Sequence, residues 1–436
     1  MRARNRELLG LLPASLLVTA GFAGVFIQRS NQLSNISLTY GAIFLGLCLV
    51  AHIFIRVTLP HADPYMFPLV AVLACFGLVM VYRIDSTEAR QQAEWFVIGL
   101  ILFIGTIVVF RDYRKLEQYR YLIMVVSLVI LVLPRVPGLG QYTAGAYLAV
   151  KVPGLGGFQP EEFAKIGLVI FLASYLRDTR QVLVAGRRFL GITIPPVKHL
   201  GPVLVIWGLA MGVLVILSDI GSSVMFYGAL LAMLYVATSR VSFVVVGLVA
   251  AGIGFWYLGT HIPHVHARVE DWLHPFNPHL YNAVLGSQQV ANGVFAQAAG
   301  GLFGQGFGQA ILTVPGTTAQ VIPASSTDMI YAVITDELGL FGAAALLLVY
   351  LMLVARGFKA AMLAADSFSK LMATGLSAVV ALQVFVIVGG VTRVIPLTGV
   401  TLPFVSYGGS SIIANFVLVA LLLLVSDRSR RPAEAR

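Results

Sequence analysis

The chain has 436 residues, of which 58% are hydrophobic and only 11% are charged, and its mean hydropathy is +0.89. Soluble domains carry about 25% charged residues, so this composition excludes both a water-soluble globule and a disordered chain. Apolar runs of roughly 20 residues recur along the sequence, as expected for helices that cross a bilayer. Strands of an outer-membrane barrel alternate in polarity and rarely give such runs. The sequence therefore predicts an all-α, polytopic membrane protein.

About twelve transmembrane helices are predicted from these runs. The first follows a short basic N-terminus, and we interpret it as a retained helix because no clear small-residue cleavage site precedes a soluble domain. The predicted spans are 8–28, 40–57, 66–82, 92–110, 119–134, 160–176, 201–218, 220–238, 241–259, 328–355, 371–392 and 408–426.

The formal net charge of +10 comes from 29 basic and 19 acidic residues. The basic residues lie in short loops and in the tails, so the positive-inside rule explains the charge better than a nucleic-acid partner does. This rule places both termini in the cytoplasm. Basic runs such as 111–120 and 177–198 are interpreted mainly as topology signals that contact lipid headgroups, with a partner-binding patch as the alternative. Cys48 and Cys75 lie within apolar runs and form neither a disulfide framework nor a CxxC site.

Two predicted external loops are long, 135–159 and 260–327, and a long loop is usually functional. The second contains the segment GGLFGQGFG at 300–308. It lacks the preceding strand and the Lys-Ser/Thr of a phosphate-binding loop, so we expect its backbone to pack at the membrane surface. This loop also holds five of the eight histidines. Their spacing matches no zinc pattern and favours an interfacial cluster over a metal site: His261, His264, His266, His274 and His279.

Ionisable groups at membrane depth are costly and indicate function by default. Glu162 and Lys165 are i, i+3 neighbours after Pro160, so they predict either a local ion pair or one wall of a polar cavity open to the outside. Asp219 lies in a tight turn between two spans. It is either a turn or helix-capping residue or a further residue of that cavity.

Three further acids lie at the start of the predicted span 328–355. Asp328 ends the longest predicted external loop. Its carboxylate could stabilise the N-terminus of the following helix through the helix dipole, or it could reach a lipid headgroup or its sugars. Asp336 and Glu337 follow about 12–13 Å deeper at the rise of an α-helix. We expect these two to be paired structurally, with proton or ion transfer as the alternative.

Several segments, in this order, resemble the SEDS family (shape, elongation, division and sporulation), which includes RodA, FtsW and SpoVE. The most specific is IPLTGVTLPFVSYGGSS at 395–411. Shorter matches precede it, namely FQPEEFAK at 158–165, SDIG at 218–221, TDMIYAV at 327–333 and DELG at 336–339.

This resemblance implies a ten-helix glycosyltransferase core at 66–436, with 1–65 as two additional N-terminal transmembrane helices. Such proteins polymerise lipid II into the glycan strands of peptidoglycan at the outer face of the bacterial plasma membrane. They work with a class B penicillin-binding protein that crosslinks the nascent strand. Overall likeness favours the RodA type, which serves elongation and cell shape, over the FtsW type, which serves division.

The resemblance also assigns residues. Asp328 matches the essential external aspartate, and Glu162, Lys165, Asp219 and Gln289 match polar residues of the family's cavity. We expect Asp328 to act as the base for the attacking hydroxyl or to hold a divalent cation such as Mg²⁺ or Mn²⁺. The leaving diphosphate needs positive charge, for which the external candidates are Lys165, Lys151, Arg268 and Arg393.

The chain departs from the family pattern in the first external loop. The family usually has Gly-Ala-x-Arg-Trp there, whereas this chain reads GAYLAVK at 145–151, so Lys151 is the nearest positive charge. Glu161 replaces a usual Ser and Ile387 stands where Asn is frequent. Two other functions remain open from the sequence, a flippase for the lipid-linked precursor and a non-catalytic scaffold for wall synthesis.

Overall fold

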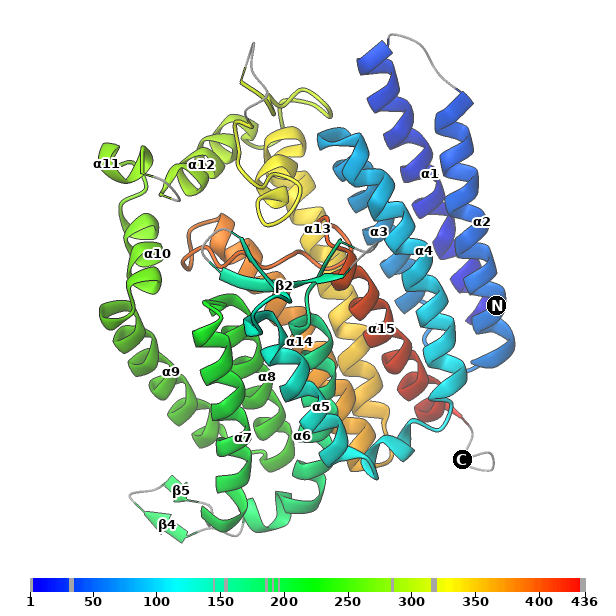
Figure 1. Cartoon of the computed structure of the whole chain (residues 1–436). Helices are drawn as coiled ribbons and strands as arrows, with labels where there is room; N and C mark the ends of the chain where they lie inside the picture. Colours follow the sequence, from blue (N-terminus) through cyan, green and yellow to red (C-terminus); the bar gives the residue numbers. More distant parts are fainter. Residues whose placement is uncertain are drawn as a thin grey trace. The chain divides into compact units, whose positions relative to one another are not determined.

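The computed structural model describes residues 3–30, 35–143, 146–152, 156–184, 187–189, 192–194, 197–283, 286–314 and 320–431 (Figure 1). Within this part of the chain, nine helices are long and apolar enough to cross a membrane. Every predicted span coincides with a helix, which confirms the all-α, multi-pass membrane fold. The helices that coincide with the twelve predicted spans are α1 (Ala3–Ser30), α2 (Asn35–Thr58), α3 (Met66–Ile84), α4 (Ser86–Val109), α5 (Arg120–Val132), α6 (Glu161–Val184), α7 (Val197–Ile216), α8 (Ile220–Thr238), α9 (Val241–His261), α13 (Ile330–Leu363), α14 (Ser367–Val391) and α15 (Gly409–Arg430).

The two long loops that are predicted to be external are more structured than the sequence predicts. The first contains the antiparallel sheet β1 (Gly140–Thr143), β2 (Ala146–Val152) and β3 (Gly156–Phe158). The second contains α10 (Pro263–Leu273), α11 (Pro278–Tyr281) and α12 (Gln288–Gly300). A two-stranded hairpin, β4 (Arg187–Phe189) and β5 (Ile192–Ile194), lies between α6 and α7. These strands and helices are shorter than a membrane span and are not continuous apolar runs, so a search for runs of about 20 apolar residues did not reveal them.

The chain divides into two compact units. Unit 1 comprises Met1–Arg111, Asp271–Arg356 and Gln383–Arg436, and unit 2 comprises Asp112–Glu270 and Gly357–Leu382. The first two helices therefore share a unit with α3, α4 and α15. The assignment of 1–65 as an addition to a separate core stays a prediction.

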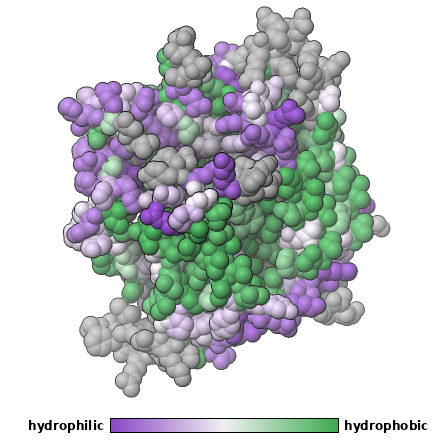
Figure 2. All heavy atoms as spheres, in the orientation of Figure 1, coloured by the Kyte–Doolittle hydropathy of each residue, from purple (hydrophilic) through white to green (hydrophobic). Residues whose placement is uncertain are grey.

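Unit 1 is built around α15, which is almost entirely buried. Its Phe416 packs against Phe96 of α4 and against Phe404, with ring centroids 5.5 and 5.2 Å apart. A side chain at Gly99 would collide with this ring, since its Cβ would lie 2.5 Å from Phe416. Small residues let membrane helices approach closely, and dispersion contacts then hold them together. On the visible face, hydrophobic side chains gather along α1, α2 and α4 (Figure 2).

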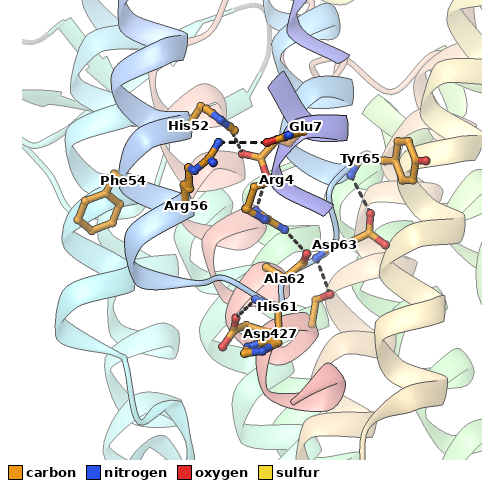
Figure 3. Close-up of polar contacts among 12 residues, drawn as sticks. Arg4, Glu7, His52, Phe54, Arg56, His61, Ala62, Asp63, Tyr65 and Asp427 are labelled. Atoms are coloured by element: carbon orange, nitrogen blue, oxygen red, sulfur yellow. Dashed lines mark hydrogen bonds and ion pairs between the residues drawn. The ribbon is translucent and has the colours of Figure 1, made fainter. Parts of the chain in front are cut away.

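Buried polar groups join the start of α1 to α2 and to the chain between α2 and α3 (Figure 3). The Arg4 side chain pairs with Glu7 and donates to the Ala62 carbonyl, and His52 Nδ1 lies 2.9 Å from Glu7. Buried charges without partners are costly, so this cluster fixes how the first two helices join the bundle.

Asp63, buried between α2 and α3, extends this network to α13 and α15. Its carboxylate pairs with Arg430 and lies 3.8 Å from Arg356, and its amide donates to Ser426. Arg356, near the end of α13, thus lies at the same end of unit 1 as both chain termini.

The longest transmembrane helix, α13, is broken at Gly339, which has φ 65° and ψ −170°. The glycine-rich segment 300–308 lies against this break and supplies the hydrogen bonds that the helix loses. The four bonds are Gln305 N to Asp336 O (2.9 Å), Gly306 N to Glu337 O (3.1 Å), Leu340 N to Gly301 O (3.0 Å) and Phe341 N to Leu302 O (3.2 Å). The segment therefore packs its backbone against a helix rather than lying only on the membrane surface.

The side chain of Glu337 secures the same junction. It is fully buried, lies 3.2 Å from Arg83 of α3 and accepts a hydrogen bond of 3.0 Å from the Gly308 amide. Arg83 also donates to the carbonyls of Gly308 and Ala310. The prediction of structural pairing is thus confirmed for Glu337.

Replacement of Gly339 by alanine tests this junction. The backbone conformation at Gly339 is accessible almost only to glycine, and an added Cβ would lie 2.3 Å from the Gly304 nitrogen. We expect Gly339→Ala to lower the free energy of unfolding by about 2 kcal/mol or more, measured as a lower Tm in detergent. Gly46→Ala is the control, because its Cβ would meet nothing within 4 Å, and it should leave Tm unchanged or raise it slightly. Equal Tm for both variants would contradict this interpretation of the break.

Candidate functional site

Asp328 lies two residues before α13 begins, at the end of the helix opposite to Arg356. α13 runs along unit 1 on both sides of its break at Gly339, from Ile330 to beyond Arg356 (Figure 1). Arg356 marks the end of unit 1 where both termini lie. Asp328 is therefore at the other end of unit 1 from the termini.

Two side chains orient the half-buried Asp328 carboxylate. The Thr327 hydroxyl donates to Oδ1 over 2.9 Å, and the Gln289 amide on α12 donates to Oδ2 over 3.1 Å. Gln289, which the resemblance alone had indicated, thus contacts Asp328 directly.

The segment 395–411 holds the turn that carries Asp328. The hydroxyl of Ser406 donates to the Thr327 carbonyl over 2.6 Å and accepts the Leu402 amide over 2.9 Å. The Tyr407 amide donates to the Ser326 carbonyl over 2.8 Å. The most specific motif of the sequence therefore acts here as a brace for the turn at Asp328.

Glycine also shapes this contact. Gly399 adopts φ +74°, and a Cβ there would lie 3.8 Å from the Asp328 carboxylate. The backbone of the motif thus passes close to the acidic group without a side chain between them.

The sequence analysis missed one residue of this assembly, Gln92. It is buried in α4, donates to the Ser406 carbonyl over 2.9 Å and accepts the Gly408 amide over 3.2 Å. A polar side chain at the start of a predicted span was the available signal. Its partners, Ser406 and Gly408, lie far along the chain, so the sequence could not distinguish Gln92 from an ordinary solvent-facing residue at a helix end.

In unit 2, Glu162 and Lys165 form a buried ion pair at the start of α6, which confirms the expected local pairing. Asp219 caps α8 by accepting the Ser222 amide over 2.9 Å, as the turn predicted. The pKa of the Asp219 carboxyl is raised above its usual value, mainly because the group is buried. The nearby Glu162 carboxylate also raises this pKa, whereas hydrogen bonds from Ser222 and the Arg268 guanidinium oppose the rise. Asp219 therefore lies within electrostatic reach of both Glu162 and Arg268.

The other two predicted cations differ in their surroundings. Lys151 is exposed on β2, opposite Gly157 in the sheet register. Gly145, in the same loop, lies outside the described residues. Arg393 is half-buried after α14, where it exchanges hydrogen bonds with Trp272. The prediction that all these groups line one cavity remains a prediction.

A divalent cation finds few protein ligands. Among the described residues, no three His, Cys, Asp or Glu side chains are grouped closely enough to hold a metal ion. Asp328 offers a single carboxylate. Its neighbours Thr327 and Gln289 both direct donors at that carboxylate. In the part of the chain that the structure describes, protein side chains alone therefore do not complete a metal site at Asp328.

Comparison with known proteins places this arrangement in context. The sequence model of the FtsW/RodA/SpoVE family, described as a cell cycle protein, matches residues 64–431. The peptidoglycan glycosyltransferase RodA of Mycobacterium leprae is 38% identical to this chain over 444 residues, covering 99% of this chain and 92% of that protein.

Two solved structures are also similar. One belongs to a study of how a peptidoglycan synthase complex coordinates polymerisation and crosslinking. Its matching chain has a TM-score of 0.67 and 26% identity, and the match covers 85% of this chain and 99% of that one. The crystal structure of RodA from Thermus thermophilus gives a TM-score of 0.58 and 25% identity, with 85% and 98% covered.

The brace at Ser406 gives a testable prediction. Ser406→Ala leaves the Leu402 amide and the Thr327 carbonyl without their shared partner, at a cost of about 1–3 kcal/mol. We expect faster backbone hydrogen exchange in peptides that cover 323–330, measured by mass spectrometry. Ser377→Ala is the matched control, since that buried hydroxyl bonds only its own helix at Ala373. If both variants left exchange in 323–330 unchanged, Ser406 would not brace the turn.

Proposed function

This chain belongs to the FtsW/RodA/SpoVE family, and from that premise we propose that it is a peptidoglycan glycosyltransferase of the RodA type. It polymerises lipid II into glycan strands that serve cell elongation and shape. The observation that carries the proposal is the half-buried Asp328 carboxylate, oriented by Thr327 and Gln289 at the end of unit 1 opposite to the termini. Since both substrates keep their lipid tails in the bilayer, an apolar enzyme suits a reaction of sugars.

The reaction forms one bond and breaks one. The C4 hydroxyl of an N-acetylglucosamine attacks the anomeric carbon of a muramoyl unit, while the bond from that carbon to the undecaprenyl diphosphate oxygen breaks. Asp328 accepts the hydroxyl proton, which makes a weakly nucleophilic alcohol competent. The bond electrons leave with the diphosphate. Because the donor carries an activated leaving group, a second carboxylate of the glycosidase type is not required.

The departing diphosphate concentrates negative charge and needs cationic partners. Lys165 and Arg268 are our candidates. Lys165 pairs with Glu162, and Arg268 lies within electrostatic reach of Asp219. A buried lysine held by a carboxylate is oriented before substrate arrives, so little reorganisation accompanies catalysis.

The orientation follows from charge. Basic loops place both termini in the cytoplasm, which puts Asp328 at the outer surface of the plasma membrane. We further propose that a class B penicillin-binding protein crosslinks the strands that this chain makes. The likeness to a chain of a complex that couples polymerisation to crosslinking supports this partner.

Asp328→Asn tests the proposal. An amide keeps the size of the side chain but cannot accept the proton, so we expect a loss of polymerisation rate of about 10²–10⁴-fold. The measurement is the rate at which purified full-length protein, with its co-purifying partner, converts labelled lipid II into glycan ladders on a gel.

Asp366→Asn is the control, because Asp366 is also half-buried and precedes a helix, where it only caps α14 through Ser369. It should polymerise at the wild-type rate. Full activity of Asp328→Asn would remove Asp328 from the mechanism. Movement of lipid II across liposomes by the wild type without any glycan ladder would instead support a flippase.

A further inference from the structure

Arg393 has a backbone conformation that its side chain does not favour. It follows α14 with φ +59°, in the left-handed region that is uncommon for residues other than glycine. Strained residues of this kind persist where the surrounding structure holds them, and they gather at functional sites. A glycine would fit this position without strain, so the retained arginine side chain calls for an explanation.

The surroundings lock Arg393 in place. Its Nη2 donates to the Trp272 carbonyl over 2.9 Å, and the Trp272 indole donates back to the Arg393 carbonyl over 2.9 Å. The guanidinium also lies 5.9 Å from the Phe276 ring centroid. Its orientation is thus fixed before any ligand binds.

The guanidinium keeps unused hydrogen-bonding capacity. Its Nε is buried, and within the described chain it has no hydrogen-bond partner. A guanidinium has five N–H donors, arranged to match phosphate oxygens. A fixed arginine with an unsatisfied donor is therefore suited to bind an anion.

Exposed apolar side chains continue from this contact. Phe276, between α10 and α11, and Phe295 of α12 have ring centroids 5.4 Å apart and are 51% and 55% exposed, and Val394, next to Arg393 in the chain, is 61% exposed. A soluble phosphate would gain nothing from such a rim, whereas a phosphorylated lipid would use both the cation and the apolar surface. The loop that carries Arg393 lies at the same end of unit 1 as Asp328, since Tyr407 later in that loop bonds Ser326.

We propose that Arg393, with Trp272, Phe276, Phe295 and Val394, binds the diphosphate headgroup and first isoprene units of an isoprenoid diphosphate. This inference rests on the proposed function, because the polymerisation releases a ligand of that class. It assigns the released carrier lipid a site on the loop after α14, separate from the turn at Asp328.

The test is binding of undecaprenyl diphosphate to the purified full-length protein in detergent, measured by native mass spectrometry. Arg393→Gly removes the cation, relieves the backbone strain and keeps the carbonyl that accepts from Trp272. We expect its affinity to fall about tenfold or more, as the loss of charge-assisted hydrogen bonds implies, and Arg393→Lys to recover part of it. Arg135→Gln is the matched control, because Arg135 is an exposed arginine 4.7 Å from the Tyr147 ring centroid. It should bind like the wild type.

The same measurement distinguishes the ligand's source. Phosphatidylglycerol should bind wild type and Arg393→Gly equally. Inorganic phosphate should bind the wild type far more weakly than undecaprenyl diphosphate does, because it gains nothing from the apolar rim, and equal affinities of these two ligands would contradict a lipid site. If phosphatidylglycerol lost affinity as much as undecaprenyl diphosphate, the site would be a general phospholipid contact and the proposal would be wrong. Equal binding of undecaprenyl diphosphate to wild type and Arg393→Gly would also overturn it. Each of these binding results would leave the proposed function intact as long as the wild type makes normal glycan ladders. Absence of ladders from the wild type would count against the proposed function and not against the Arg393 site.

Discussion

A bilayer offers no water to satisfy a free peptide N–H or C=O, and this constraint explains how unit 1 is built. The long helix α13 can break at Gly339 only because the backbone of 300–308 supplies the missing hydrogen bonds. Likewise, the irregular segment 395–411 is stabilised by side chains directed at its backbone, such as Gln92 to Ser406 and Gly408. Non-helical chain near the membrane is therefore confined to places where protein groups satisfy it, and Asp328 lies beside one of them.

The buried charges of the chain divide by what they contact. Glu337 with Arg83, and Asp63 with Arg430, join elements far apart in the sequence, and such pairs mainly prevent the cost of an isolated buried charge. Asp328 accepts hydrogen bonds from two neutral donors, Gln289 and Thr327. These donors orient the carboxylate, and a base must be oriented toward the proton that it takes.

Hydropathy predicted the transmembrane helices well, because a run of about 20 apolar residues in a membrane protein almost always forms a membrane-spanning helix. It did not predict the sheet β1–β3 or the helices α10–α12, because none of these elements is a long apolar run. Local spacing predicted the pair Glu162–Lys165 and the cap at Asp219, since both contacts lie within four residues. The contacts of Ser406 with Thr327 and of Trp272 with Arg393 join positions 79 and 121 residues apart. Only the folded chain reveals contacts of that kind, so the motif 395–411 was recognisable while its role as a brace was not.

The central claim is that the Asp328 carboxylate takes the proton of the sugar hydroxyl that attacks. The most direct measurement is the distance between an Asp328 carboxylate oxygen and the C4 hydroxyl of the acceptor, in a structure of the full chain and its partner with unreactive lipid II analogues bound. The account predicts about 2.6–3.2 Å, or the same spacing through one water. A carboxylate that contacts only the diphosphate, or that faces lipid tails far from either sugar, would contradict it.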